Sequence, residues 1–179
     1  MDFLVETHLT QPAERVVRAF MDELERVTPY MKSVDDVHTV ERDQGEGDAQ
    51  RIIRKWQGSA MSSPAVLRPF LTKESLSWLD DALWFPSEYR VEWNVTSSMS
   101  RLYTCGGTNY FEPHPEHPDE WTRVRLTGKI QIHPDKFPGV PTFLARKLAP
   151  ALERFIVKKF EPNFRDLAAG LQRYFDDGA

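Results

Sequence analysis

The last quarter of the chain, residues 141–175, has the pattern of one long amphipathic helix. Its apolar side chains recur mostly at steps of three and four residues, which places them on one face of a helix. They are Leu144, Leu148, Leu152, Phe155, Ile156, Phe160, Phe164, Leu167, Leu171 and Phe175. Charged residues occupy the other face, so the apolar face must pack on the rest of the protein or on a partner. Pro150 and Pro162 each remove a backbone donor, and they predict kinks or a break in this helix.

A first strand and a first helix are predicted at the N-terminus. Apolar and polar residues alternate over residues 3–9, which is the period of a half-buried strand. Residues 10–12 then end the strand and open a helix. The apolar face of that helix consists of Ala13, Val16, Val17, Phe20, Leu24 and Val27. Pro29 is expected to end it.

Six further segments have the composition of β-strands, several of them with clear alternation. They cover residues 37–43, 50–57, 74–85, 88–97, 101–113 and 121–133. The glycine-bearing connection 44–48 is typical of a hairpin. Segment 58–73 breaks the pattern because Pro64 and Pro69 interrupt any ladder. We predict that this segment is a lid or a crossover packed on the sheet edge.

The predicted order is one strand, one helix, six strands and one long helix, which is an α+β architecture. Successive hairpins predict a curved antiparallel sheet of about seven strands. The C-terminal helix is the only amphipathic element long enough to close its concave face, so we expect the sheet to wrap around that helix.

In this element order the chain resembles the helix-grip superfamily of START domains, Bet v 1-like proteins and polyketide cyclases, also called SRPBCC proteins. The resemblance spans the whole chain, and locally it rests on the strand 3–6 leading into residues 12–16 and on the closing helix. Residues 137–141 and 162–163 also look like segments of uncharacterised bacterial members. Segment 58–73 departs from the pattern, since it is longer and richer in proline than a simple hairpin. No catalytic signature accompanies the resemblance, so it implies a fold more than an activity.

Composition restricts the class further. With 179 residues, 40% of them hydrophobic, the chain is long enough for one core, and we expect a single domain over residues 1–179. The formal net charge of -4 disfavours nucleic-acid binding. The first ten residues lack the basic start and apolar core of a signal peptide, and no apolar run reaches membrane-spanning length. Together with a single cysteine, Cys105, these features favour a cytoplasmic protein without an internal disulfide.

The resemblance implies a cavity between sheet and helix that holds a lipid, a sterol, a polyketide or another apolar molecule. A dry, empty cavity of about 300 Å³ would cost about 7 kcal/mol, so a real pocket must be filled, hydrated or collapsed. Aromatic side chains are the candidate walls because they offer broad flat contacts. They are Trp56, Trp78, Tyr89, Trp93, Tyr103, Tyr110, Phe111, Phe155, Phe160 and Phe164. The alternative for each is ordinary core packing.

Two charged residues fall on otherwise apolar strand faces. Alternation places Arg54 with Trp56, and Asp80 with Trp78. If these faces look inward, the two charges could orient a ligand carboxylate or phenol, or polarise an enolisable ketone as a cyclase requires. The catalytic candidates for an enzyme would then be Arg54, Asp80, Tyr103 and Tyr110. The alternatives are a structural ion pair or a register that leaves both residues in water.

Other motifs give weaker signals. His114 and His117 form a His-x-x-His pair in a proline-rich turn, but without the fixed geometry of a metal site. Cys105 precedes two glycines, yet no helix N-terminus or basic partner adjoins it, so a buried thiol is favoured. No Gly-x-Ser-x-Gly or Gly-x-Gly-x-x-Gly motif is present. We therefore predict no metal and no cofactor.

Three functional hypotheses remain. The first is a non-catalytic carrier of an apolar or amphipathic small molecule, the second is an enzyme of the polyketide cyclase or aromatase type, and the third is a chaperone-type interaction module. Cations along the last helix add peripheral membrane contact as an alternative, although acidic neighbours dilute the patch. They are Arg146, Lys147, Arg154, Lys158 and Lys159. No obligate partner is predicted, and the oligomeric state is left open.

Overall fold

A computed structural model describes residues 1–62, 72–74, 76–98 and 100–178, apart from the side chains of residues 62, 155, 159 and 160. Within these residues, seven antiparallel strands form one sheet in the order β1-β7-β6-β5-β4-β3-β2. The strands are β1 (Asp2–Leu9), β2 (Val34–Gln44), β3 (Gln50–Gly58), β4 (Ser77–Phe85), β5 (Arg90–Ser97), β6 (Tyr103–Pro113) and β7 (Thr122–Ile132). The predicted α+β class and the seven-stranded sheet are confirmed.

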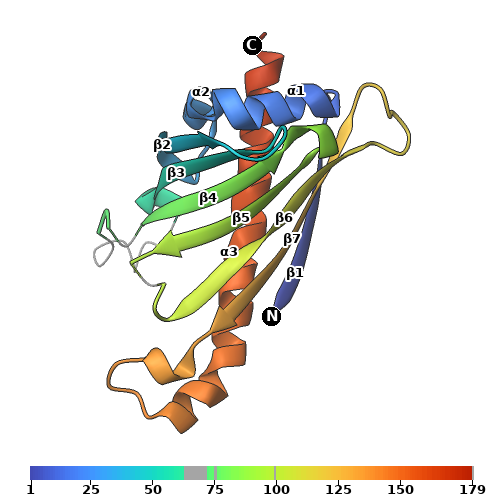
Figure 1. Cartoon of the computed structure of the whole chain (residues 1–179). Helices are drawn as coiled ribbons and strands as arrows, with labels where there is room; N and C mark the ends of the chain where they lie inside the picture. Colours follow the sequence, from blue (N-terminus) through green and yellow to red (C-terminus); the bar gives the residue numbers. More distant parts are fainter. Residues whose placement is uncertain (63–71, 75, 99, 179) are drawn as a thin grey trace.

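Helical elements cover one end and one face of the sheet (Figure 1). They are α1 (Ala13–Arg18), a π-helical turn (Ala19–Glu23), α2 (Leu24–Val27) and α3 (Thr142–Asp176), with short 3₁₀ turns at Thr28–Tyr30, Ala60–Ser62, Pro86–Glu88 and Pro134–Lys136. The segment from α1 to α2 crosses one end of the strands, and α3 runs along the sheet on the face that we call the inner face. The helix-grip prediction is therefore confirmed. Of the predicted lid segment 58–73, residues 63–71 lie outside the described part of the chain.

Alternation along the strands decides which side chains enter the core. In β1, Phe3, Val5 and Leu9 are buried, whereas the residues between them are exposed or half-buried. β1 pairs with β7 so that Val5 lies opposite Leu126. Apolar residues of both strands therefore share the inner face, where they meet α3.

A row of small residues makes room for two large rings on the inner face. Phe3, Gly128, Gly107 and Trp93 lie side by side on four adjacent strands. A Cβ at Gly128 would stand 2.4 Å from the Phe3 ring, and one at Gly107 would stand 2.9 Å from the Trp93 ring and 2.0 Å from the Thr127 carbonyl oxygen. Only glycine therefore allows the rings to lie over these two positions.

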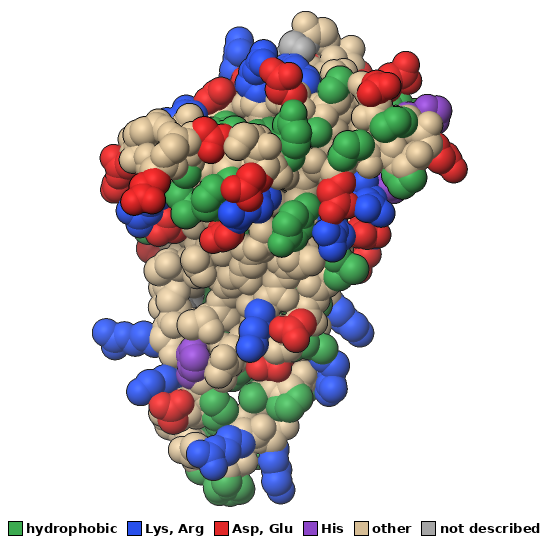
Figure 2. Space-filling view, turned by 45° about the vertical axis from the view of Figure 1, so that its right-hand side comes forward, with side chains coloured by type: hydrophobic (Ala, Val, Ile, Leu, Met, Phe, Trp, Pro, Cys, Tyr) green, Lys and Arg blue, Asp and Glu red, His purple; other side chains and the backbone are tan. Residues whose placement is uncertain are grey.

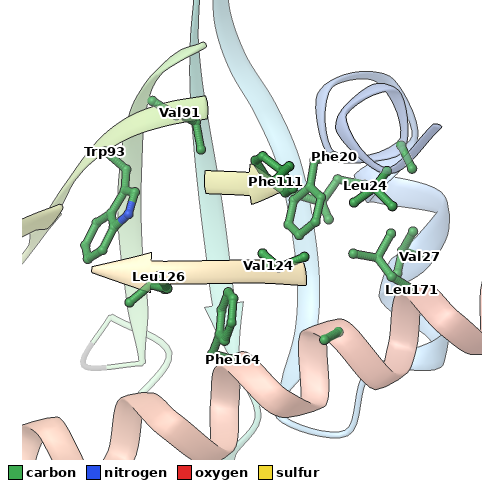
Figure 3. Packing of buried hydrophobic residues seen from close by; sticks show 14 of the residues in the cluster. Phe20, Leu24, Val27, Val91, Trp93, Phe111, Val124, Leu126, Phe164 and Leu171 are labelled. Carbon is green, nitrogen blue, oxygen red and sulfur yellow. The ribbon is translucent and has the colours of Figure 1, made fainter. Parts of the chain in front are cut away.

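The C-terminal half of α3 packs firmly on the core. Phe164 lies below β7 between Val124 and Leu126, and Leu171 lies beside Val27 (Figure 3). Asp166 fixes the chain before β2, because its Oδ2 accepts hydrogen bonds from the Ser33 amide (2.7 Å) and hydroxyl (2.7 Å) and from the Lys32 amide (2.8 Å). This end of the helix is thus held by packing and by polar contacts.

Helix α3 runs without a break through both prolines. Pro150 and Pro162 are exposed, as are Arg146 and Lys158, whose carbonyls lose their helical donors. Since these carbonyls lie on the solvent side, water can satisfy them, and the helix continues. Of the predicted kinks or break, the break does not occur.

Candidate functional site

The inner face of the sheet divides into two regions by burial. Under α1 and α2, residues such as Ile52, Ala82 and Phe111 are at most 2% exposed and form closed core. Toward the other end of the strands, several inner-face residues are only half-buried. They are Trp78, Asp80, Val95, Ser97 and Tyr103, and we call this set the inner-face site.

Strand pairing places Arg54 directly beside this site. Arg54 on β3 lies opposite Asp80 on β4, and Asp80 lies opposite Val95 on β5. The next row contains Trp56, Trp78 and Ser97. A cation and a carboxylate therefore adjoin each other on an inner face whose neighbouring positions are apolar or aromatic.

Arg54 is held in place by a hydrogen bond to the turn between α1 and α2. Its side chain is 3% exposed, and its Nη2 donates a hydrogen bond of 2.5 Å to the Met21 carbonyl. Met21 belongs to the π-helical turn between α1 and α2, and a turn of this kind leaves carbonyls without their usual helical donors. The guanidinium is thus fixed, and its Nε–H is buried without a partner in the described part of the chain.

Electrostatics set the two groups apart from ordinary surface residues. Burial is the largest cause that raises the pKa of Asp80, to about 7, and the positive charge of Arg54 acts against this rise. Burial also lowers the pKa of Arg54. Asp80 as a whole residue is half-buried, yet removal of its carboxyl from water outweighs the attraction of Arg54. A carboxyl with this pKa can both donate and accept a proton near neutral pH.

Aromatic side chains flank the charged pair. The Trp56 and Trp78 rings stack with centroids 5.8 Å apart and planes 10° apart. Trp93 is 7% exposed and donates its indole N–H to Asn109 Oδ1 at 2.9 Å, and the Tyr103 hydroxyl lies 3.2 Å from Ser97 Oγ. The structure therefore brings four predicted site residues, Arg54, Asp80, Trp56 and Trp78, together at one end of the inner face.

Two predicted wall residues lie elsewhere. Tyr110 is on the outer face, opposite Arg90 and Arg125, and the Arg125 guanidinium carbon lies 4.8 Å from the centroid of its ring. Tyr103 and Tyr110 are seven residues apart in one strand, so alternation puts them on opposite faces. Tyr89 precedes β5 in a left-handed turn with φ of 49° and is 39% exposed. Neither Tyr89 nor Tyr110 lines the inner face, so both predictions are corrected.

The three phenylalanines predicted on the last helix have different outcomes. Phe164 is 7% exposed and belongs to the closed core near β7. The side chains of Phe155 and Phe160 lie outside the described part of the structure. Their roles as ligand contacts remain predictions.

Two hollows in the described surface lie on the outer face of the sheet. One measures about 460 Å³ and is lined by residues that include Asn94, Lys129 and Gln131. The other measures about 560 Å³ and is lined by residues that include Leu4 and Thr127. Neither hollow lies between the sheet and α3, so the predicted cavity there remains a prediction.

The two histidines of the His-x-x-His motif pack against aromatic rings, and the cysteine is buried. His114 packs against His8 and Trp121, with ring centroids 4.7 Å and 5.3 Å away, and His117 lies 4.2 Å from the Trp121 ring. Within the described residues, no group of three or more His, Cys, Asp and Glu side chains has the geometry of a metal site. Cys105 is 4% exposed, and burial raises the pKa of its thiol to about 12. It is therefore a neutral thiol in the core.

Sequence reasoning missed two polar residues of the inner face. Asn109 receives the Trp93 indole hydrogen bond, and Ser97 pairs with Tyr103. Both have the strand parity of apolar inner-face residues, since Asn109 lies two residues from Phe111 and Ser97 two residues from Val95. That parity was the signal that could have identified them.

Comparison with solved structures identifies the fold. Protein TTHA0849 from Thermus thermophilus matches with a TM-score of 0.67 and 23% identity over 100% of both chains. The Zhui aromatase/cyclase from Streptomyces sp. R1128 matches with a TM-score of 0.62 and 12% identity, over 100% of this chain and 98% of that one. The di-domain ARO/CYC BexL from the BE-7585A biosynthetic pathway matches with a TM-score of 0.64 and 16% identity, over 98% of this chain and 46% of that one.

These similarities confirm the START/Bet v 1-like helix-grip fold. No protein-family model matches the sequence, and no curated protein matches it in sequence. In the described part of the chain, every helix is too short or too polar to span a bilayer.

Proposed function

We propose that this chain, which has the START/Bet v 1-like helix-grip fold, binds an amphipathic small molecule at the inner-face site. The apolar or aromatic body of the ligand would lie against Trp78, Val95 and Tyr103, and its polar group would approach Asp80 beside Arg54. The observation that carries the proposal is the pairing of buried Arg54 with half-buried Asp80 on a largely apolar face of the sheet.

The charges define the polar group that fits. Asp80 has a pKa of about 7, so near neutral pH it can donate a hydrogen bond to a carbonyl or accept one from a phenol or enol. Arg54 keeps its positive charge and favours an oxygen that carries negative charge. A phenol, an enolisable ketone or a carboxylate on a hydrophobic skeleton satisfies both residues, and this is the chemistry of a polyketide-like or lipid-like molecule.

The first experiment is native mass spectrometry of the freshly purified protein, followed by denaturing extraction. A stoichiometric apolar adduct would identify the ligand class. In parallel, tryptophan fluorescence would follow binding of anilinonaphthalene sulfonate, which joins an aromatic skeleton to an anionic group. A clean mass together with no probe binding would contradict the proposal and favour a protein-interaction role.

Matched variants test the location of the site. Trp78→Ala removes an inner-face ring and should weaken probe binding about tenfold or more, since burial of such a ring is worth about 1.5–3 kcal/mol. Tyr110→Ala removes an aromatic ring from the outer face of the same sheet and should leave binding unchanged. Equal effects of both variants would place the ligand elsewhere.

A second candidate function is aromatase or cyclase chemistry. The observation that favours it is the raised pKa of Asp80, because an acid–base group with a pKa near the working pH transfers protons efficiently. Two structures of similar fold are also named as aromatase/cyclases. With a synthetic poly-β-ketone, Asp80→Asn should abolish cyclisation while probe binding persists. A wild-type protein that binds the poly-β-ketone without converting it would be a carrier.

A further inference from the structure

The first turns of α3 carry a group of exposed apolar side chains. Phe143 is 67%, Leu148 47% and Leu144 41% exposed, whereas Ala145 between them is 3% exposed. At about 100° per residue, these three residues and Lys147 fall within an arc of about 140° on one side of the helix, and Ala145 lies outside that arc. They are three of the nine large apolar residues classed as exposed in the described structure. Apolar surface is therefore concentrated at this end of the helix.

The same end of the molecule is basic, although the chain is acidic as a whole. Residues 134–158 contain five cations and two acids, while the formal net charge of the chain is -4. The five cations are all exposed: Lys136, Arg146, Lys147, Arg154 and Lys158. Both acids have partners, since Asp135 lies 3.2 Å from the Lys136 ammonium and Glu153 lies 3.5 Å from the N-terminal ammonium. Figure 2 shows Lys and Arg side chains around hydrophobic ones at the lower end of the molecule.

We propose that this end of α3, residues 142–158, is a docking surface for an anionic lipid bilayer. Figure 1 shows that the helix begins beyond the ends of the strands, so this end can approach a flat surface without obstruction by the strands. Phe143, Leu144 and Leu148 would enter the boundary between headgroups and acyl chains, and the cations would contact anionic headgroups. Positive charge around exposed apolar side chains is the complement of such a membrane. The inference goes beyond ligand binding and does not depend on it.

Co-sedimentation with vesicles tests the proposal. The intact protein should bind vesicles made of equal parts phosphatidylcholine and phosphatidylserine, and it should bind pure phosphatidylcholine much more weakly. Phe143→Asp should reduce binding about tenfold or more, because it removes a large inserted side chain and adds a repelled charge. The acidic residue falls in the first turn of α3, where negative charge favours the helix, so the variant should remain folded.

Matched controls separate docking from general surface effects. Val40→Asp changes an apolar residue that is 56% exposed on β2, and it should leave vesicle binding unchanged. Lys147→Glu should weaken binding at least about fivefold, because each cation near an anionic surface contributes about that factor. Lys55→Glu makes the same charge change at an exposed position of β3 and should have a clearly smaller effect.

Three outcomes would overturn the proposal. The first is equal binding of wild-type protein to neutral and anionic vesicles, or no binding to either. The second is a Phe143→Asp variant that binds like wild type. The third is sedimentation equilibrium that shows a dimer which Phe143→Asp dissociates, because the apolar side chains would then be covered by a second copy of the chain.

Discussion

The raised pKa of Asp80 predicts a specific dependence of stability on pH. In the folded protein the carboxyl has a pKa of about 7, compared with an ordinary value of 3.8. At pH values between these two pKa values, the Asp80 carboxyl is ionised in the unfolded chain but keeps its proton in the folded protein. Folding therefore takes up a proton, and this stabilises the folded state at low pH. The stabilisation is complete below the unfolded pKa and is lost as the pH rises through the folded one.

The magnitude follows from the two pKa values. Between pH 5 and pH 8, Asp80 should reduce the free energy of unfolding by at most about 2.5 kcal/mol. We regard this as an upper figure because the residue is half-buried and solvent screens part of the effect. Asp80→Asn cannot titrate, so this part of the pH dependence should disappear in the variant. Other titrating groups contribute to both proteins and cancel in the comparison.

Urea unfolding at pH 5 and pH 8, followed by circular dichroism, measures the effect. The fall in unfolding free energy between the two pH values should be larger in wild type than in Asp80→Asn. Asp81→Asn, on the outer face where its carboxylate pairs with Arg51 at 2.6 Å, is the control. It should retain most of the wild-type fall, because burial is the largest cause of the raised pKa of Asp80 and the charge of Asp81 is a lesser one. If the fall in unfolding free energy between pH 5 and pH 8 differs by less than about 0.5 kcal/mol between wild type and Asp80→Asn, Asp80 is not desolvated and the acid–base argument fails.

Three further predictions concern the elements that hold the site. Leu171→Ala should lower the free energy of unfolding by about 2–5 kcal/mol in urea titrations, because the side chain is fully buried, whereas Leu148→Ala should change it by less than about 0.5 kcal/mol. Gly107→Ala should lower the melting temperature strongly, since a Cβ would lie 2.0 Å from a backbone oxygen; an unchanged melting temperature would contradict the close approach of the strands. Asp166→Ala should lower the free energy of unfolding by about 1–3 kcal/mol. It should also speed hydrogen exchange at the Ser33 amide, because it removes the acceptor of that amide's hydrogen bond.

Much of the fold could be predicted from periodicity alone. The alternation of residues 3–9 and 88–97 and the helical spacing after residue 141 determined the type, order and approximate bounds of the elements. Alternation also determined that Arg54 shares a face with Trp56, and Asp80 with Trp78. These features are local, because the period of side-chain direction is a property of each strand or helix by itself.

Only the tertiary structure decided how those faces meet. Arg54 lies opposite Asp80 because of the register between β3 and β4, and the raised pKa of Asp80 follows from the burial of its carboxyl beneath the rest of the fold. The apolar pattern of the last helix is similar at both of its ends, yet Leu171 is fully buried and Leu148 is 47% exposed. A repeat of three and four residues specifies which side of a helix is apolar, but the length of sheet available to cover it is a property of the whole fold.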